Sequence, residues 1–164
     1  MGPSFPPLPD DLVAHAHDGV SCLVGTASAD LVPDCVRGAG VRIWPGACQL
    51  TVLIPAATGA TAIKNLRENP HLAVTLSKIP TYRTVQIKGK VLGIRDGDET
   101  DRAAGRAYLE KLAADLEWAG QPRTVSMRLG FWPCFAVDLE IEVAYVQTPG
   151  PVAGNKLPLQ TGSR

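Results

Sequence analysis

The chain has 164 residues, of which 45% are hydrophobic, and it carries 16 acidic and 16 basic side chains. This length favours a single domain over residues 1–164, whose core needs no metal or disulfide to hold it together. The balanced charge argues against nucleic acid or an anionic membrane surface as a partner. No apolar run is long enough to span a membrane, and no basic segment precedes an apolar one at the N-terminus, so we expect neither a membrane protein nor a secreted one.

The four cysteines are Cys22, Cys35, Cys48 and Cys134. None belongs to a C-x-x-C pair, and no histidine stands at zinc-finger spacing from them. Each falls inside a predicted strand, where cysteine usually behaves as a small buried apolar residue. We therefore expect reduced thiols, no metal site and a cytoplasmic protein.

The first half of the chain predicts a proline-rich segment, a short helix and three strands. These elements span residues 1–9, 11–18, 21–27, 35–43 and 48–54. Asp10 is placed to cap the helix and Gly19 to end it. Proline followed by glycine predicts a type II turn over 44–47, which joins the last two strands as a hairpin.

The second half predicts two helices, three strands and a terminal loop. These elements span residues 59–69, 71–77, 84–95, 98–119, 134–146 and 147–164. Pro70 ends the first helix, and Asp98 caps the second. Gly89 and Gly93, which lie within a strand, predict bulges or sharp bends.

The strand pattern indicates the fold class. Strand 134–146 alternates apolar and polar residues, which predicts one buried face and one solvated face. Six strands of this kind, mostly linked by short turns, close most economically into a barrel that leaves no exposed edge. The sequence thus predicts a mainly β fold, an antiparallel barrel of six strands with inserted helices.

The middle of the chain combines features that suit a planar ligand carrying a phosphate. A helix start offers backbone N–H groups and the hydroxyls of Thr58 and Thr61, and Gln86 offers a paired donor and acceptor. Arg37 and Arg42 supply cations on one predicted strand, provided that a bulge at the glycines between them brings both to one face. Each feature also has a simpler explanation, because threonines cap helices and polar side chains on strands face solvent.

Four segments, in their order and spacing, resemble the flavin-binding split barrel of the pyridoxamine 5′-phosphate oxidase family. They are GTASAD (25–30), RGAGVR (37–42), KNLRENP (64–70) and RTVQIKG (83–89). The resemblance implies a homodimer that binds flavin mononucleotide (FMN) at the subunit interface, with both chains contributing to each site. It implies these cofactor-contacting residues: Arg37, Val41, Arg42, Ile54, Thr58, Thr61, Lys64, Arg83 and Gln86. One departure stands out, because Thr61 and Ala62 occupy the positions where the family usually has an Arg-Lys pair on the phosphate.

The resemblance implies a flavin-dependent oxidoreductase that acts on a small organic molecule. No side chain is identified as catalytic, which is expected where the cofactor carries the redox chemistry. A fold does not fix a function, so a second hypothesis stays open. On it, the same barrel is a non-catalytic carrier or sensor for flavin, deazaflavin or haem, or it holds no cofactor at all.

Overall fold

The computed structural model describes residues 8–43 and 48–157. Most of the predicted proline-rich segment, the predicted turn at 44–47 and the end of the predicted terminal loop lie outside the described residues.

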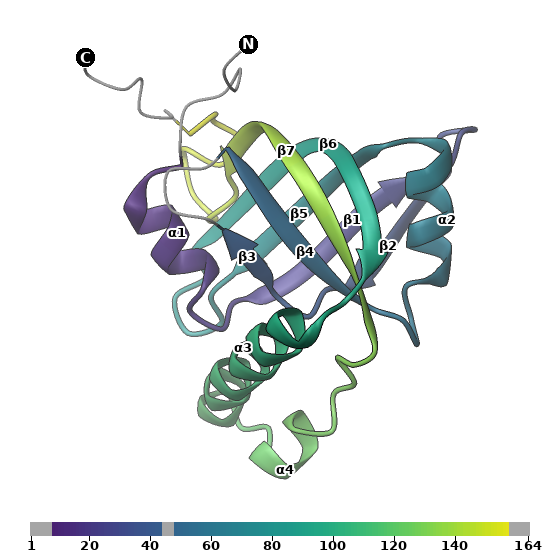
Figure 1. Cartoon of the computed structure of the whole chain (residues 1–164). Helices are drawn as coiled ribbons and strands as arrows, with labels where there is room; N and C mark the ends of the chain where they lie inside the picture. The colour runs from purple at the N-terminus through teal and green to yellow at the C-terminus, as the bar shows by residue number, and fades with distance from the viewer. Residues whose placement is uncertain (1–7, 44–47, 158–164) are drawn as a thin grey trace.

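One antiparallel sheet in the order β2-β1-β5-β6-β7-β4-β3 forms the body of the molecule (Figure 1). Its strands are β1 (Ser21–Ala27), β2 (Pro33–Arg37), β3 (Val41–Ile43), β4 (Gln49–Pro55), β5 (His71–Ser77), β6 (Thr84–Asp96) and β7 (Cys134–Val146). The sheet curls strongly, and inward side chains from all its strands share one apolar core. The prediction of a mainly β, curled antiparallel sheet with helices is confirmed.

The strand number was wrong, because the predicted strand 35–43 is two strands, β2 and β3. The chain breaks at Gly40, whose φ of +99° is a left-handed conformation that glycine adopts readily. A Cβ on Gly40 would also lie only 2.8 Å from Cγ of Tyr108. Just before it, the Ala39 N–H donates to the Leu53 carbonyl at 2.7 Å, which ties this crossing segment to β4. Arg37 and Arg42 therefore lie on different strands and not on one bulged strand.

The helices are α1 (Asp10–Ala16), α2 (Ala60–Glu68), α3 (Glu99–Trp118) and α4 (Arg123–Ser126). The predicted cap of α3 is confirmed, because Asp98 Oδ1 accepts from the Asp101 N–H at 2.9 Å. The predicted cap of α1 is wrong, because Pro9 holds that position and no side chain caps the helix. The sequence did not predict α4. No helix in the described part of the chain is long and apolar enough to cross a membrane.

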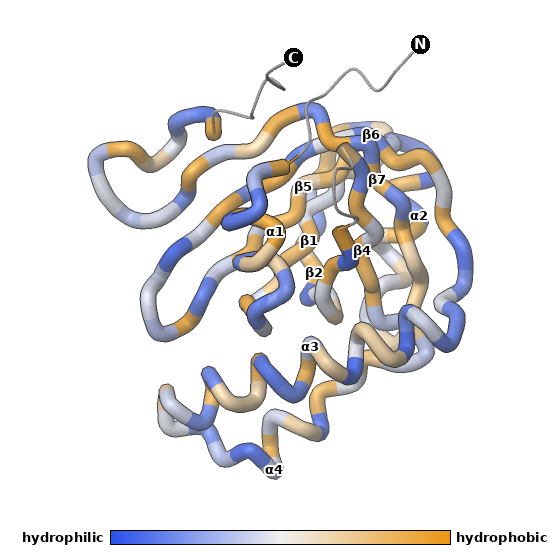
Figure 2. Tube along the Cα trace, turned by 60° about the vertical axis from the view of Figure 1, so that its left-hand side comes forward, coloured by the Kyte–Doolittle hydropathy of each residue, from blue (hydrophilic) through white to orange (hydrophobic). Residues whose placement is uncertain are grey.

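The helices lie around the barrel rather than in a separate layer. α1 and α3 contact β3, and α2 contacts β1 and β2 (Figure 1). α2 contributes Ala62, Ile63 and Leu66 to the core. Figure 2 shows hydrophobic residues gathered on the strands, whereas hydrophobic and hydrophilic residues alternate along α3. None of the described helices has its main contacts with β5 or β6.

The predicted alternation of β7 holds only for its first part. The pairing of β6 with β7 shifts register beside Gly89, so Glu142 becomes an extra, exposed residue. Beyond it Ala144 is buried, and Val143 and Tyr145 turn to the outer side of the sheet. The bulges predicted at Gly89 and Gly93 are confirmed, since both residues follow register shifts.

The described part of the predicted terminal loop folds back onto its own chain. The Gly154 N–H donates to the Val146 carbonyl at 2.7 Å, and the Leu157 N–H donates to the Ala144 carbonyl at 2.9 Å. Lys156 forms a bridge to Tyr145. This segment thus pairs with the end of β7 where β4 no longer does.

A buried carboxylate joins the helical insertion to the sheet. Asp101, in the first turn of α3, is fully buried and is ion-paired with Arg42 of β3 and with Arg95 of β6, the latter at 2.5 Å. The same carboxylate accepts the Asp98 N–H at 3.1 Å, which completes a capping box. Burial alone would raise the pKa of Asp101, but the hydrogen bonds from Arg95, Asp98 and Arg42 outweigh it and lower the pKa from 3.8 to about 2.

Replacing Asp101 with Asn should destabilise the protein strongly, because two guanidinium groups lose their shared counter-charge. Removing one partner of a buried ion pair typically costs about 3 kcal/mol or more. The free energy of unfolding, measured by denaturant titration, should fall by that amount. Glu99→Gln is the control, because its carboxylate is exposed and only weakly paired with Arg102, at 3.5 Å. Equal stabilities of the two variants would contradict this role of Asp101.

Asp101 should also make the fold sensitive to acid. Its folded-state pKa lies below the unfolded value, so its contribution is present above about pH 4 and is lost as the pH falls towards 2. The difference between the two pKa values corresponds to about 2 kcal/mol. Between about pH 5 and pH 2, the unfolding free energy of the wild type should therefore fall by about 2 kcal/mol more than that of Asp101→Asn. Parallel curves for the two proteins would refute the assignment.

Candidate functional site

The start of α2 is an open group of hydrogen-bond donors. No side chain caps this helix, and its first turn contains no acidic residue. Within the described part of the chain, nothing accepts a hydrogen bond from the N–H groups of Ala60, Thr61 and Ala62. Thr58 and Thr61 are exposed beside these groups. This arrangement suits an anion, since helix N-termini favour negative charge.

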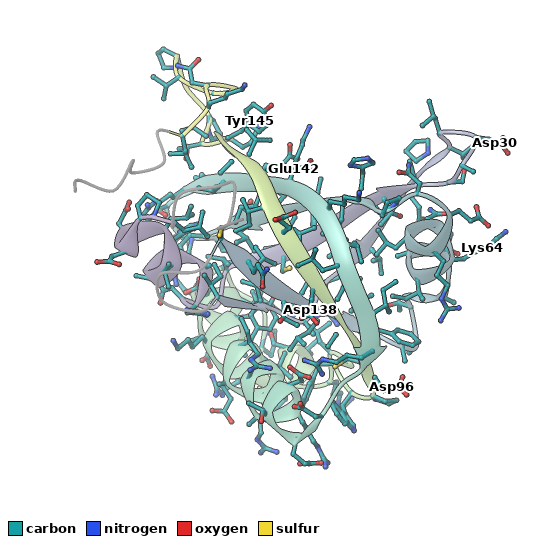
Figure 3. All side chains as sticks on the ribbon, turned by 45° about the horizontal axis from the view of Figure 1, so that its top comes forward. Asp30, Lys64, Asp96, Asp138, Glu142 and Tyr145 are labelled. Carbon is teal, nitrogen blue, oxygen red and sulfur yellow. The ribbon has the colours of Figure 1, made fainter. Side chains whose placement is uncertain are left out.

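Thr61 and Ala62, which stand where the family usually has an Arg-Lys pair, differ in exposure. Ala62 is buried in the core at 1% exposure, so a cation at this position would point inwards. Thr61 is exposed. Lys64 follows three residues later and stands out from α2 (Figure 3), on the same side of the helix as Thr61. Lys64 is therefore the α2 cation that the structure places beside Thr61.

Arg37 carries a charge that no acidic side chain of the described residues balances. At the end of β2, its guanidinium donates to the Gly38 carbonyl at 3.3 Å and to the Gly130 carbonyl at 2.7 Å. Among the described residues, no carboxylate lies within ion-pair distance of it. β2 lies against both α2 and β4, and β4 leads into α2. Arg37 thus adds an uncompensated positive charge to the end of the barrel where α2 begins.

Arg42 and Arg83 lie elsewhere. Arg42 faces α3 and pairs with Asp101, and Thr51, its partner on β4, lies four residues before Pro55. At strand spacing this places Arg42 about 13 Å from the end of β4. Arg83 pairs with Asp11 of α1 at 2.8 Å. One chain therefore does not bring these two arginines to the start of α2, and their cofactor roles stay predictions.

Val41 and Ile54 are core residues. Val41 is 6% exposed and Ile54 is completely buried. Ile54 lies under the turn into α2, since a Cβ on Gly59 would be 2.5 Å from its Cγ2. Ile54 thus supports the helix start from beneath, whereas Val41 packs near α3.

Gln86 lies on the outer side of the sheet, in a row that crosses five strands. Pairing places Arg37, Leu23, Thr75, Gln86 and Tyr145 side by side on β2, β1, β5, β6 and β7. The Gln86 side-chain amide donates to Thr75 Oγ1 at 3.1 Å. The structure thus places two predicted residues, Arg37 and Gln86, on one face of the sheet, with two strands between them.

A hollow of about 350 Å³ opens next to this row. Gly25 and Ala73 make its floor, because their small side chains leave space on the outer side of β1 and β5. Its walls include His71, Lys88 and Glu142, all exposed. Nothing in the sequence marks His71 as a functional residue, because a histidine at a strand start after a proline carries no signal by itself.

The remaining titratable groups give no sign of redox or metal chemistry in the described chain. Burial raises the pKa of Cys22 to about 12 and that of Cys134 to about 11, which keeps both thiols protonated. Burial also lowers the pKa of His15 and of His17. Among residues 8–43 and 48–157, no three histidine, cysteine or acidic side chains converge as metal ligands would.

The curled antiparallel sheet with helices around it defines the class of fold. The family model for pyridoxamine 5′-phosphate oxidase matches residues 9–132, so this chain belongs to that family. A comparison with curated proteins finds no match.

Solved structures share the fold at low sequence identity. HupZ of group A Streptococcus superposes with a TM-score of 0.54 at 15% identity, covering 90% of this chain and 99% of that one. A candidate pyridoxamine 5′-phosphate oxidase of Lactobacillus delbrueckii gives 0.55 at 15% identity, with 85% and 94% covered. An F420 reductase gives 0.51 at 14% identity, with 84% and 98% covered. At these identities the likeness establishes the fold alone.

Gly59→Ala should disturb the helix start. The new Cβ would lie 2.5 Å from Ile54 Cγ2 and 2.8 Å from the Pro55 carbonyl, so the turn must shift. We expect the unfolding free energy to fall by about 2 kcal/mol, as for other overpacked sites. Gly93→Ala is the matched control, because no atom lies within 4 Å of its Cβ position. Thermal or chemical denaturation of both variants measures the difference, and equal stabilities would show that Gly59 is not tightly packed.

Proposed function

We propose that this protein is a flavin-dependent oxidoreductase that binds FMN between two copies of the chain and acts on a small organic molecule. The observation that carries the proposal is the uncapped start of α2, with the Thr58 and Thr61 hydroxyls and the unbalanced charge of Arg37 at the same end of the barrel. These groups fit a phosphate that is held by neutral donors and one or two cations. When bound, the flavin supplies the two-electron chemistry.

The polar side chains on the outer side of the sheet support the proposed binding of the flavin ring. Gln86 and Thr75 present amide and hydroxyl groups at half-exposed positions on adjacent strands. An amide next to a hydroxyl suits the paired carbonyl and N–H groups at the edge of a flavin. A deazaflavin carries the same edge, and the fold shared with an F420 reductase keeps that cofactor within the proposal.

His71 favours a second candidate, a haem-type carrier or sensor. Its imidazole is exposed on the wall of the 350 Å³ hollow, and no described residue hydrogen-bonds to it. Neutral imidazole is a common ligand of haem iron. On this candidate, haem titration gives a Soret band that His71→Ala abolishes, and flavin does not bind.

Titration of the purified protein with FMN and riboflavin tests the first candidate. Arg37→Met should weaken FMN binding about tenfold, or about 1.4 kcal/mol, and leave riboflavin binding unchanged, because only FMN carries the phosphate. Arg67→Met, on the last turn of the same helix, is the matched control. Flavin fluorescence quenching measures both affinities. Equal losses for the two flavins would remove Arg37 from the phosphate site, and no binding of either flavin would overturn the proposed function.

A further inference from the structure

The helix α1 joins two strands that are not neighbours in the sheet. Its last turn presents His15 and His17, which lie two positions apart and so point to different sides of the helix. Nε2 of His15 lies 3.2 Å from the Leu76 carbonyl oxygen of β5. Nε2 of His17 lies 3.2 Å from the Ile43 backbone nitrogen of β3. Three strands, β6, β7 and β4, separate β5 from β3 in the sheet, so the two imidazoles hold α1 across the barrel.

The same helix covers one end of the apolar core. Leu12 and Ala16 of α1 are buried in the core, together with Leu8 just before the helix. β3 is the last strand of the sheet, so the N–H groups on its free edge have no strand partner, and His17 accepts the one of Ile43. In Figure 1, α1 lies beside β3, on the opposite side of the barrel from α2. α1 is therefore a cover that is separate from the proposed phosphate site.

The two hydrogen bonds require opposite protonation of the Nε2 atoms. A carbonyl oxygen only accepts, so Nε2 of His15 carries a proton. A backbone N–H only donates, so Nε2 of His17 carries none, and neutral His17 holds its proton on Nδ1. When His17 takes up a second proton, its Nε2–H and the Ile43 N–H become two donors that face each other. Protonation of His17 thus breaks the bond between α1 and the edge of β3.

A protonated His15 would keep its hydrogen bond but would place a charge in the interior, because this residue is only 5% exposed. The charged groups around it are Lys78 and Arg83 from the turn between β5 and β6, and Asp11 and Asp18 at the two ends of α1. Both cations are already ion-paired, Lys78 with Asp18 and Asp115, and Arg83 with Asp11. Burial, and after it the charges of Arg83 and Lys78, outweigh the hydrogen bond to Leu76 and hold the pKa of His15 below 6.5.

The groups that face His17 from the neighbouring elements are cationic as well. Lys111 of α3 and Arg42 of β3 line a cavity of about 200 Å³ together with His17. Lys111 Nζ donates to the His17 carbonyl at 2.7 Å, and Arg42 is paired with Asp101. Partial burial of the ring, and after it the charge of Lys111, lower the pKa of His17. Acidification therefore charges both imidazoles against their surroundings.

We propose that α1 is an acid-sensitive lid, which protonation of His15 and His17 loosens from the end of the barrel. Both histidines have a lower pKa in the closed state than in an open one, so their stabilising effect is complete above about pH 6.5 and is lost as the pH falls. Opening uncovers the free edge of β3, where an unpaired strand edge offers its backbone groups to another chain. The proposal does not depend on the proposed function.

Amide hydrogen exchange of the full chain tests the lid. Between pH 7.5 and pH 5.5, and after correction for intrinsic exchange rates, the opening equilibrium constant of α1 should rise at least tenfold. The reason is that each histidine favours the open state by about tenfold at one pH unit below 6.5, less the share that the closed state also protonates. α3, which contains no histidine, is the internal reference and should change less than twofold. Asp101 does not contribute in this range, because its pKa is about 2.

Glutamine can keep both hydrogen bonds without titrating, since its amide donates as His15 does and its oxygen accepts as His17 does. In the double variant His15→Gln/His17→Gln, the opening of α1 should therefore change less than twofold over the same pH range. His17→Gln alone, a change at an exposed position, should keep only the part that His15 contributes. His71→Gln is the matched control, because it removes the remaining histidine of the chain and should behave like the wild type.

The nitrogen chemical shifts of the imidazoles, measured by NMR on the wild type, read the protonation states directly and need no variant to fold. The proposal requires a proton on Nε2 of His15 and on Nδ1 of His17 at pH 7.5. It is overturned by the opposite tautomers, by an α1 that opens equally at both pH values, or by a double variant that keeps the wild-type pH dependence.

Discussion

The burial of Asp101 is the constraint on which the arrangement of this molecule depends. The Asp101 carboxylate completes the capping box of α3 and also pairs with arginines from β3 and β6, so it fixes a long helical insertion against the sheet. A buried charge is tolerated only when it is paired and hydrogen-bonded, which makes all three attachments necessary at once. Arg42, which pairs with Asp101, lies away from the start of α2. The anion site proposed at the start of α2 therefore depends on Arg37 and on neutral donors.

The bulge in β7 is the second decisive feature. A regular strand would place Val143 and Tyr145 on the core side and Ala144 on the outer side of the sheet. One extra residue, Glu142, reverses the two sides for the end of the strand. It places Val143 and Tyr145 on the outer side of the sheet, next to the hollow lined by Gly25 and Ala73.

Structural features that depend on neighbours along the chain were predictable from the sequence. The capping residue of α3 and the register shifts at Gly89 and Gly93 follow from short-range preferences, and all were confirmed. The prediction of one continuous strand over 35–43 was wrong. Arg37 and Arg42 were placed together, but Gly40 and the packing of Tyr108 against it separate their strands. The ion pairs of Asp101 were not predicted, because nothing in the sequence shows that Arg42 will reach a helix 59 residues away.

By itself, the sequence determined a mainly β chain of the pyridoxamine 5′-phosphate oxidase family, with an anion-favouring helix start at Thr58 and Thr61. Only the tertiary structure decided which charges remain available and which side chains face outwards. The physical reason is that hydrophobic periodicity and capping are local properties, whereas ion pairing and strand register are settled between distant segments. Pairing with Asp101 assigns Arg42 to the fold, and the register of β6 on β7 assigns Tyr145 to the surface.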